Sequence, residues 1–283
     1  MSHAHGAAAG PPGWLLAAAL AAVAVVLYLR AARGVRTGTG RPWGARRTWA
    51  FLAGVAAAVV AVSPLVGDAT GGARGHMVQH VVLGMAAPLA LVLGAPVTLA
   101  LTSLPVAARR RAVRALASAP VQVLAHPVTA GLLHVGGLYA LYLTPLYALT
   151  LRSPAVHRAV LVHFLAAGCL FAWSLVGPER TSRRPGLRTR VGVLVVASAA
   201  HGYLAKVLYA RAPLLPAGNG HGVGELQDAA RWMYSAGDVA EVALAAALFA
   251  AWHRRRRRTS VRRVTAQAAG HPAAECSTGT TSA

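Results

Sequence analysis

The 283-residue sequence has few charged residues and very few acidic ones. Charged side chains make up 12% of it, about half of the roughly 25% that is usual in soluble domains. This shortage argues against an ordinary soluble protein. The hydrophobic content of 56% excludes an intrinsically disordered chain, because such chains are poor in apolar residues. The composition is therefore typical of a protein that crosses a membrane several times.

Lysine and cysteine are also scarce. Lys206 is the single lysine among 28 basic residues, which outnumber 7 acidic ones. The net charge of +21 would favour nucleic-acid binding only if it lay on a polar surface, so we expect no nucleic-acid partner. Cys169 and Cys276 have no cysteine nearby. This spacing excludes a disulfide framework and a Cys-x-x-Cys metal motif.

Seven segments are hydrophobic enough to cross a bilayer, for which a helix needs about 20 apolar residues. Lipid cannot satisfy open backbone groups, so each span must be a helix. We therefore predict an all-α polytopic membrane bundle. Pro88 and Pro96 fall inside the third segment and predict a bend there. The predicted spans are Trp14–Leu29, Thr48–Leu65, Gly75–Leu104, Val123–Leu149, Pro154–Val176, Val191–Ala210 and Leu226–Trp252.

Arginine clusters predict the orientation of the bundle. They follow the first, third, fifth and seventh segments and hold 22 of the 28 basic residues. The positive-inside rule places such clusters in the cytoplasm, so we predict an outer N-terminus and a cytoplasmic C-terminus. Residues 1–13 are then a short outer tail, residues 14–253 the seven-helix domain, and residues 254–283 a basic, disordered cytoplasmic tail.

Ionisable side chains inside membrane spans are costly, so they are candidates for function. His76 and His80 lie four residues apart and share one helical face, which suits binding of one metal ion. Asp238 and Glu241 lie three apart in the last span. Imidazole suits several metals and thioether selects Cu(I), so a histidine site with methionine and no cysteine favours copper. The predicted metal-site residues are His76, Met77, His80, His134, His157, His163, His201 and Asp238.

Several motifs resemble one known family. The most specific is the stretch from Gly75 to Leu89, with its His-x-x-x-His run, which continues in Gly94-Ala-Pro-Val-Thr-Leu99. The motifs that follow in order are Thr144-Pro-Leu-Tyr, the run from His163 to Trp173, Ala200-His-Gly and Gly237-Asp-Val-Ala-Glu241. Over about residues 48–252 the chain resembles the CtaG family of caa3-type cytochrome c oxidase assembly factors.

The resemblance implies a multi-pass protein of the bacterial cell membrane that helps to mature a haem–copper oxidase by handling copper. The partners it implies are oxidase subunits or an outer copper chaperone, together with membrane lipid. We expect no enzymatic activity, because the sequence has neither an HExxH nor a GxSxG motif of the kind that indicates hydrolases.

Two other functions stay open at this point. His80 and His163 lie at similar depths in their spans, and paired histidines on facing helices bind b-type haem in electron carriers. A ladder of ionisable residues also descends towards the midplane, as in proton or ion pathways. Its members are His163, His201, His134, Asp238 and Glu241.

Overall fold

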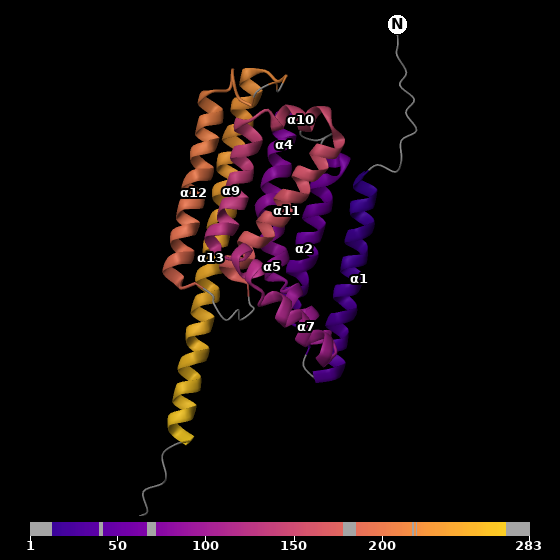
Figure 1. Ribbon diagram of the computed structural model, residues 1–283, viewed down its shortest axis with the longest axis vertical. Coiled ribbons are helices and arrows are strands. Elements are labelled where there is room, and N and C mark those ends of the chain that lie inside the picture. Colours follow the sequence, from indigo (N-terminus) through magenta and orange to yellow (C-terminus); the bar gives the residue numbers. More distant parts are fainter. Residues whose placement is uncertain are drawn as a thin grey trace, which may run out of the picture.

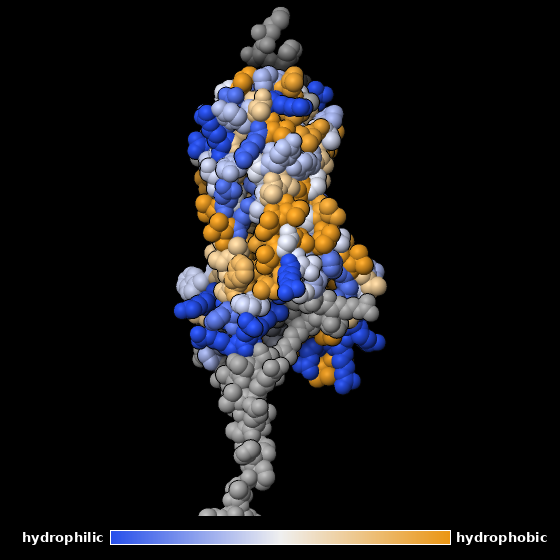
Figure 2. Space-filling model, turned by 90° about the vertical axis from the view of Figure 1, so that its left-hand side faces the viewer, coloured by the Kyte–Doolittle hydropathy of each residue, from blue (hydrophilic) through white to orange (hydrophobic). Residues whose placement is uncertain are grey.

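A computed structural model describes residues 13–39, 42–66, 72–177, 185–216, 218 and 220–269. The long helices run side by side as a bundle (Figure 1), and these described residues contain no strand. Six helical segments are long and apolar enough to cross a membrane, and a bent helix pair is a seventh candidate. Hydrophobic side chains gather in the middle part of the face that Figure 2 shows. The predicted all-α membrane bundle is confirmed.

The elements follow one another in a simple order. They are α1 (Gly13–Thr39), α2 (Ala45–Val62), α4 (Gly72–Val81), the π-helical turn η1 (Val82–Ala86), α5 (Ala87–Leu93), α6 (Pro96–Ser103), α7 (Val106–Leu116), α8 (Ala119–Leu124), α9 (Pro127–Leu143), α10 (Leu146–Arg152), α11 (Pro154–Val176), α12 (Leu187–Ala210) and α13 (Val223–Ala269). Helices α6, α9 and α11 begin with proline, whose fixed φ suits the first helical position.

The third span is distorted at its prolines, as predicted. Pro88 has no N–H to donate to the Gly84 carbonyl, and its ring crowds that carbonyl. The turn before it is accordingly π-helical, and the Ala87 N–H bonds to the Val82 carbonyl five residues back. A second break falls at Ala95, which has a φ of 53° and lies just before α6. The bend in this span is therefore confirmed.

The predicted fourth span, Val123–Leu149, is wrong as a single helix. Helix α8 ends at Leu124, α9 covers Pro127–Leu143, and α10 is bent from α9 by 76°. The cause is Pro145, which pushes the preceding residue out of the helical region; Thr144 has a ψ of 171°. The bend turns α10 across the end of the bundle, which we call the α10 end.

The opposite end of the bundle collects most of the arginines of the described residues. Helix α7 and the end of α13 both lie there (Figure 1). Arg190 of α12 donates a hydrogen bond to the Leu175 carbonyl (2.9 Å), and Arg255 of α13 donates one to the Gly177 carbonyl (2.9 Å). Leu175 lies in the last turn of α11 and Gly177 caps the helix, where backbone acceptors lack helical partners. The arginines therefore also hold α11, α12 and α13 together.

The prediction of a disordered tail from residue 254 is wrong as far as residue 269, because α13 continues to Ala269. Arginine is a good helix former, and adding residues to an existing helix needs no new nucleus. Residues 270–283 and residues 1–12 of the predicted outer tail lie outside the described residues.

The core of the bundle consists of two separate apolar layers, one towards each end. The layer at the α10 end includes Leu138 of α9 and Leu204 of α12. The layer at the arginine end includes Ala130 of α9 and Ala197 of α12. On both helices a histidine stands between the two layers. A third cluster, around Tyr28, attaches α1 to the side of the bundle.

Candidate functional site

The first group of polar side chains lies at the α10 end, where four elements meet. His76 of α4 has its ring centroid 5.4 Å from that of His157 on α11 and 4.9 Å from that of Tyr147 on α10. The Tyr147 hydroxyl is 3.4 Å from Nε2 of His221, which precedes α13. We call His76, Tyr147, His157 and His221 the mouth cluster. Its three imidazoles come from α4, from α11 and from the segment before α13, and Tyr147 contacts two of them.

Glu225 fixes the geometry of the mouth cluster. One carboxylate oxygen accepts a hydrogen bond from the Ala73 N–H (2.8 Å), a free amide in the first turn of α4, and lies 3.2 Å from Nδ1 of His221. A Cβ on Gly72, which has a φ of 39°, would collide with that oxygen. Glycine at this position therefore lets the start of α13 dock on the start of α4, and this contact positions His76 and His221.

The second group is buried between the two apolar layers. His80 of α4 and His201 of α12 are 1% and 2% exposed, and their ring centroids are 6.0 Å apart. Nδ1 of His201 lies 3.3 Å from a carboxylate oxygen of Glu241 on α13. His134 of α9 is also buried and stacks on Phe171. We call His80, His134, His201, Glu241 and Met85 the inner cluster.

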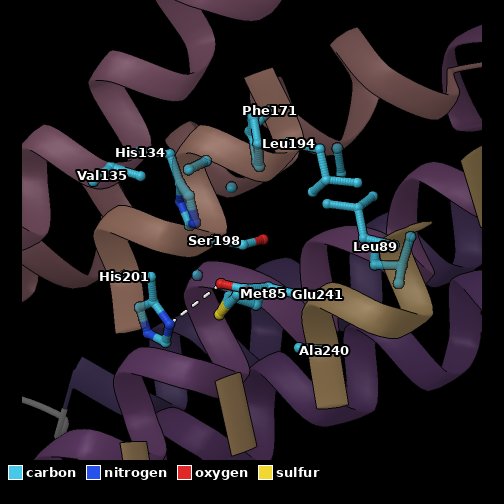
Figure 3. A pocket seen from close by; sticks show the side chains of 15 residues that line it. Met85, Leu89, His134, Val135, Phe171, Leu194, Ser198, His201, Ala240 and Glu241 are labelled. Atoms are coloured by element: carbon cyan, nitrogen blue, oxygen red, sulfur yellow. Dashed lines mark ion pairs between the residues drawn. The ribbon is translucent and has the colours of Figure 1, made fainter. Parts of the chain in front are cut away.

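Met85 and Glu241 belong to the inner cluster because they line one cavity with two of its histidines. The cavity has a volume of about 20 Å³, which is enough for one water molecule. Figure 3 shows His134 and His201 on its wall, with the Met85 sulfur and the Glu241 carboxylate beside them. Two imidazoles, a thioether and a carboxylate therefore surround a space of atomic size.

The inner cluster has an unusual number of unsatisfied polar atoms. Both ring nitrogens of His80, both of His201, Nδ1 of His134 and the hydroxyl of Tyr142 are buried without a hydrogen bond. The contact of His201 with Glu241 is short enough for an ion pair, but it is not aligned as a hydrogen bond. A buried unsatisfied group costs about 1–3 kcal/mol. Each of these atoms needs a partner that the described residues do not supply, such as a water molecule or an ion.

Two glycines lie against these rings. A Cβ on Gly84 would lie 3.6 Å from Cε1 of His134 and 3.8 Å from Cε1 of His80, so this glycine stands between the two rings. A Cβ on Gly237 would collide with the ring of His201. Glycine at 237 therefore allows α13 to approach the His201 ring, whereas a Cβ at Gly84 would make only ordinary contacts with the other two rings.

Comparison with known sequences identifies the family. Residues 26–255 match the family described as cytochrome c oxidase caa3 assembly factor, Caa3_CtaG. The chain belongs to this family. No solved structure matches the chain.

Three curated relatives of this chain are uncharacterized proteins of mycobacteria. Those of Mycobacterium bovis and Mycobacterium tuberculosis are each 35% identical to it over 201 residues, and that of Mycobacterium leprae is 34% identical over 203 residues. The matched segments make up 67% of this chain but 30% of each relative. The chain therefore spans less than a third of the length of these relatives.

The residues predicted to bind metal fall into three groups in the structure. His76 and His157 lie in the mouth cluster, whereas His80, His134 and His201 lie in the inner cluster. The remaining three, His163, Asp238 and Met77, are in neither. Among the described residues no three His, Cys, Asp or Glu side chains converge closely enough to hold a metal ion. The ligands of each cluster would therefore have to rotate to share an ion.

His163, Asp238 and Met77 lie outside both clusters. His163 is exposed, and its Nε2 lies 3.3 Å from the Leu133 carbonyl. Asp238 is exposed on the outer face of α13, and Met77 packs in the apolar layer at the α10 end. Asp238 was expected deep in the site, but the carboxylate that reaches the inner cluster is that of Glu241.

Sequence reasoning left out Met85 and His221 as site residues. Met85 lies five residues after His80, which puts it on another face of a regular α-helix. The π-helical turn closes hydrogen bonds over five residues and changes this register, and the proline at 88 was the available signal. His221 stands in the loop before α13, where helical periodicity gives no information.

Proposed function

We propose that this assembly factor binds copper as its cargo and supplies it to a caa3-type cytochrome c oxidase during oxidase assembly, in the bacterial cell membrane. The observation that carries the proposal is the set of buried, unpartnered imidazole nitrogens on His80, His134 and His201. Neutral imidazole is a metal ligand. The cost of burying these nitrogens is recovered when they coordinate an ion.

The chemistry of the inner cluster favours Cu(I) over divalent ions. The thioether of Met85 is a soft ligand that selects Cu(I). Glu241 is the carboxylate that contacts the cluster through His201. One carboxylate neutralises one monovalent ion, whereas a divalent ion would leave a net charge in a medium where uncompensated charge is costly.

The two clusters suggest a route for the ion. The mouth cluster lies at the surface of the α10 end and would receive copper from a donor there, such as a copper chaperone. His76 and His80 are one helical turn apart on α4, so the two clusters are joined along one helix face. Under this proposal copper moves from His76 to His80 by exchange of ligands.

A proton pathway is a second candidate, favoured by the contact of His201 with Glu241 beside a cavity large enough for one water molecule. The haem alternative is disfavoured. It needs His80 and His163 to face one cavity, but His80 is buried while His163 is exposed and lies against a backbone carbonyl.

Metal retention tests the proposal. The purified chain is loaded with Cu(I) under reducing conditions, and bound copper is measured after desalting. We expect His80→Ala/His201→Ala to lose most of the copper. His126→Asn is the matched control, because His126 only caps α9 through Nδ1, and Asn is also a capping residue. Equal copper in wild type and double variant would refute the inner site.

A second variant separates Cu(I) from divalent ions and from protons. Met85→Leu conserves volume but removes the sulfur, so it should weaken Cu(I) binding and leave Zn(II) binding unchanged. Proton flux into liposomes is measured in parallel for wild type and Glu241→Gln. Flux that depends on Glu241, with no copper bound, would favour the proton pathway instead.

A further inference from the structure

A groove on the outer surface of α12 and α13 is independent of both histidine clusters. It has a volume of about 240 Å³ and is lined by Ala205, Lys206, Tyr209, Ala230, Arg231, Tyr234 and Ser235. It lies towards the α10 end, because Lys206 is four residues from the end of α12 at Ala210. At about 1.5 Å per residue this is roughly 6 Å along the helix. The groove is therefore near the membrane interface.

Lys206 is the only lysine of the chain, and it is exposed on this groove. Its Nζ lies 5.5 Å from the centre of the Tyr234 ring. Among the described residues it has no carboxylate partner within ion-pair distance. A lysine on a membrane-facing surface extends its ammonium towards the interface, where lipid phosphates lie.

Arg231 supplies a second cation from the facing helix. Its guanidinium lies 5.0 Å from the Tyr209 ring centre and donates to the Tyr209 hydroxyl (2.8 Å) and to Asp228 (3.3 Å). A guanidinium has five N–H donors, so others stay available. The tyrosine ring restricts the side chain, and a restricted donor loses less entropy when it binds.

The surface below the groove is mainly apolar, with one exposed carboxylate, that of Asp238 next to Val239. Val195 and Val196 of α12 and Val239 and Val242 of α13 are 60–71% exposed. Figure 2 looks onto this side of the molecule and shows hydrophilic residues in its upper part, above a more continuously hydrophobic belt. A ligand with an anionic head and hydrocarbon chains would match both parts at once.

We infer that this groove binds the phosphodiester headgroup of an anionic phospholipid in the membrane leaflet at the α10 end. Lys206 and Arg231 contact the phosphate oxygens from two helices, and the acyl chains lie along the exposed valines. Basic pockets between membrane helices bind such headgroups. Asp228 reduces the net charge of the site by pairing with Arg231, so it weakens the binding without abolishing it.

Native mass spectrometry of the detergent-purified chain tests the site, with phosphatidylglycerol and phosphatidylcholine as the probes. We expect preferential retention of phosphatidylglycerol. Each basic side chain near a membrane surface contributes a factor of about five, so Lys206→Gln/Arg231→Gln should lower this preference by about 25-fold. Lys206→Arg should keep it.

Two comparisons make the result specific. Arg152→Gln/Arg158→Gln removes two exposed charges from the same end of the molecule and should leave the preference unchanged. Asp228→Asn should raise it several-fold, which a misfolded variant would not do. An equal preference in wild type and the groove double variant would overturn the inference. So would an equal loss in the Arg152/Arg158 control, or thermal stabilisation by inorganic phosphate as large as that by the lipid.

Discussion

Substitution of Gly168 tests how the inner cluster is held in place. Gly168 of α11 faces the π-helical turn. A Cβ there would collide with the Gly84 carbonyl oxygen and would lie 2.8 Å from both the Gly84 carbonyl carbon and Cγ of Pro88. Ordinary contacts begin at 3.4 Å, so α11 and η1 must separate by at least about 0.6 Å, the difference between these distances. The atoms that would have to move are backbone and a proline ring, which cannot rotate away.

The expected cost follows from this geometry. Forcing an extra methyl group into a packed interior destabilises the folded state by about 1–3 kcal/mol. Against this, replacing glycine by alanine within a helix stabilises the helix by up to about 1 kcal/mol. Gly168→Ala should therefore destabilise the chain by about 1–2 kcal/mol. For a protein of this size that corresponds to a fall in Tm of roughly 2–8 °C. Copper retention should fall as well, because Gly84 stands between His80 and His134.

Thermal unfolding in detergent, followed by fluorescence, measures the effect. Gly192→Ala is the matched control: Gly192 also lies in a membrane helix, and a Cβ there would meet nothing within 4 Å. We expect this variant to be as stable as wild type or slightly more stable. If Gly168→Ala and Gly192→Ala unfold at the same temperature, the close approach of α11 and η1 does not limit stability, and the reasoning is refuted.

Two further predictions concern hydrogen bonds between helices. Arg190→Gln removes the charge-assisted bond to the Leu175 carbonyl and should cost about 1.5–3 kcal/mol; the same thermal assay checks this, with exposed Arg188→Gln expected to be neutral. Tyr28→Phe removes the donor to the Gly94 carbonyl (2.8 Å) and the acceptor of the Trp43 indole N–H (2.9 Å), and should cost about 1–3 kcal/mol for the two hydrogen bonds. Faster amide exchange confined to α1 would support the second prediction, and unchanged exchange in α1 would contradict it.

Most of the fold was predictable because a membrane constrains the backbone strongly. Spans appear as apolar runs, and their ends as arginine clusters, whatever the helices pack against. The bend in the third span was also predictable, because its prolines are local features. The break of the predicted fourth span at Pro145 was missed, since proline inside an apolar run is compatible with a kinked span as well as with two helices.

The candidate site was predictable only in part. Histidines at membrane depth were the signal that predicted the site. Five of the predicted residues lie in the two clusters. Spacing did not distinguish Asp238 from Glu241. Residues three apart differ by about 60° around a helix, and in α13 this angle separates an exposed carboxylate from one that touches His201.

By itself the sequence determined the fold class, the approximate positions of most spans, the family and the supply of buried imidazoles, because these depend on composition, local periodicity and motif order. The tertiary structure decided which of these side chains meet. That depends on the rotation of each helix about its axis, on the π-helical turn that brings Met85 to the cavity, and on glycines that allow close approach. Each of these features is set by packing between helices far apart in the chain, so local sequence patterns do not predict it.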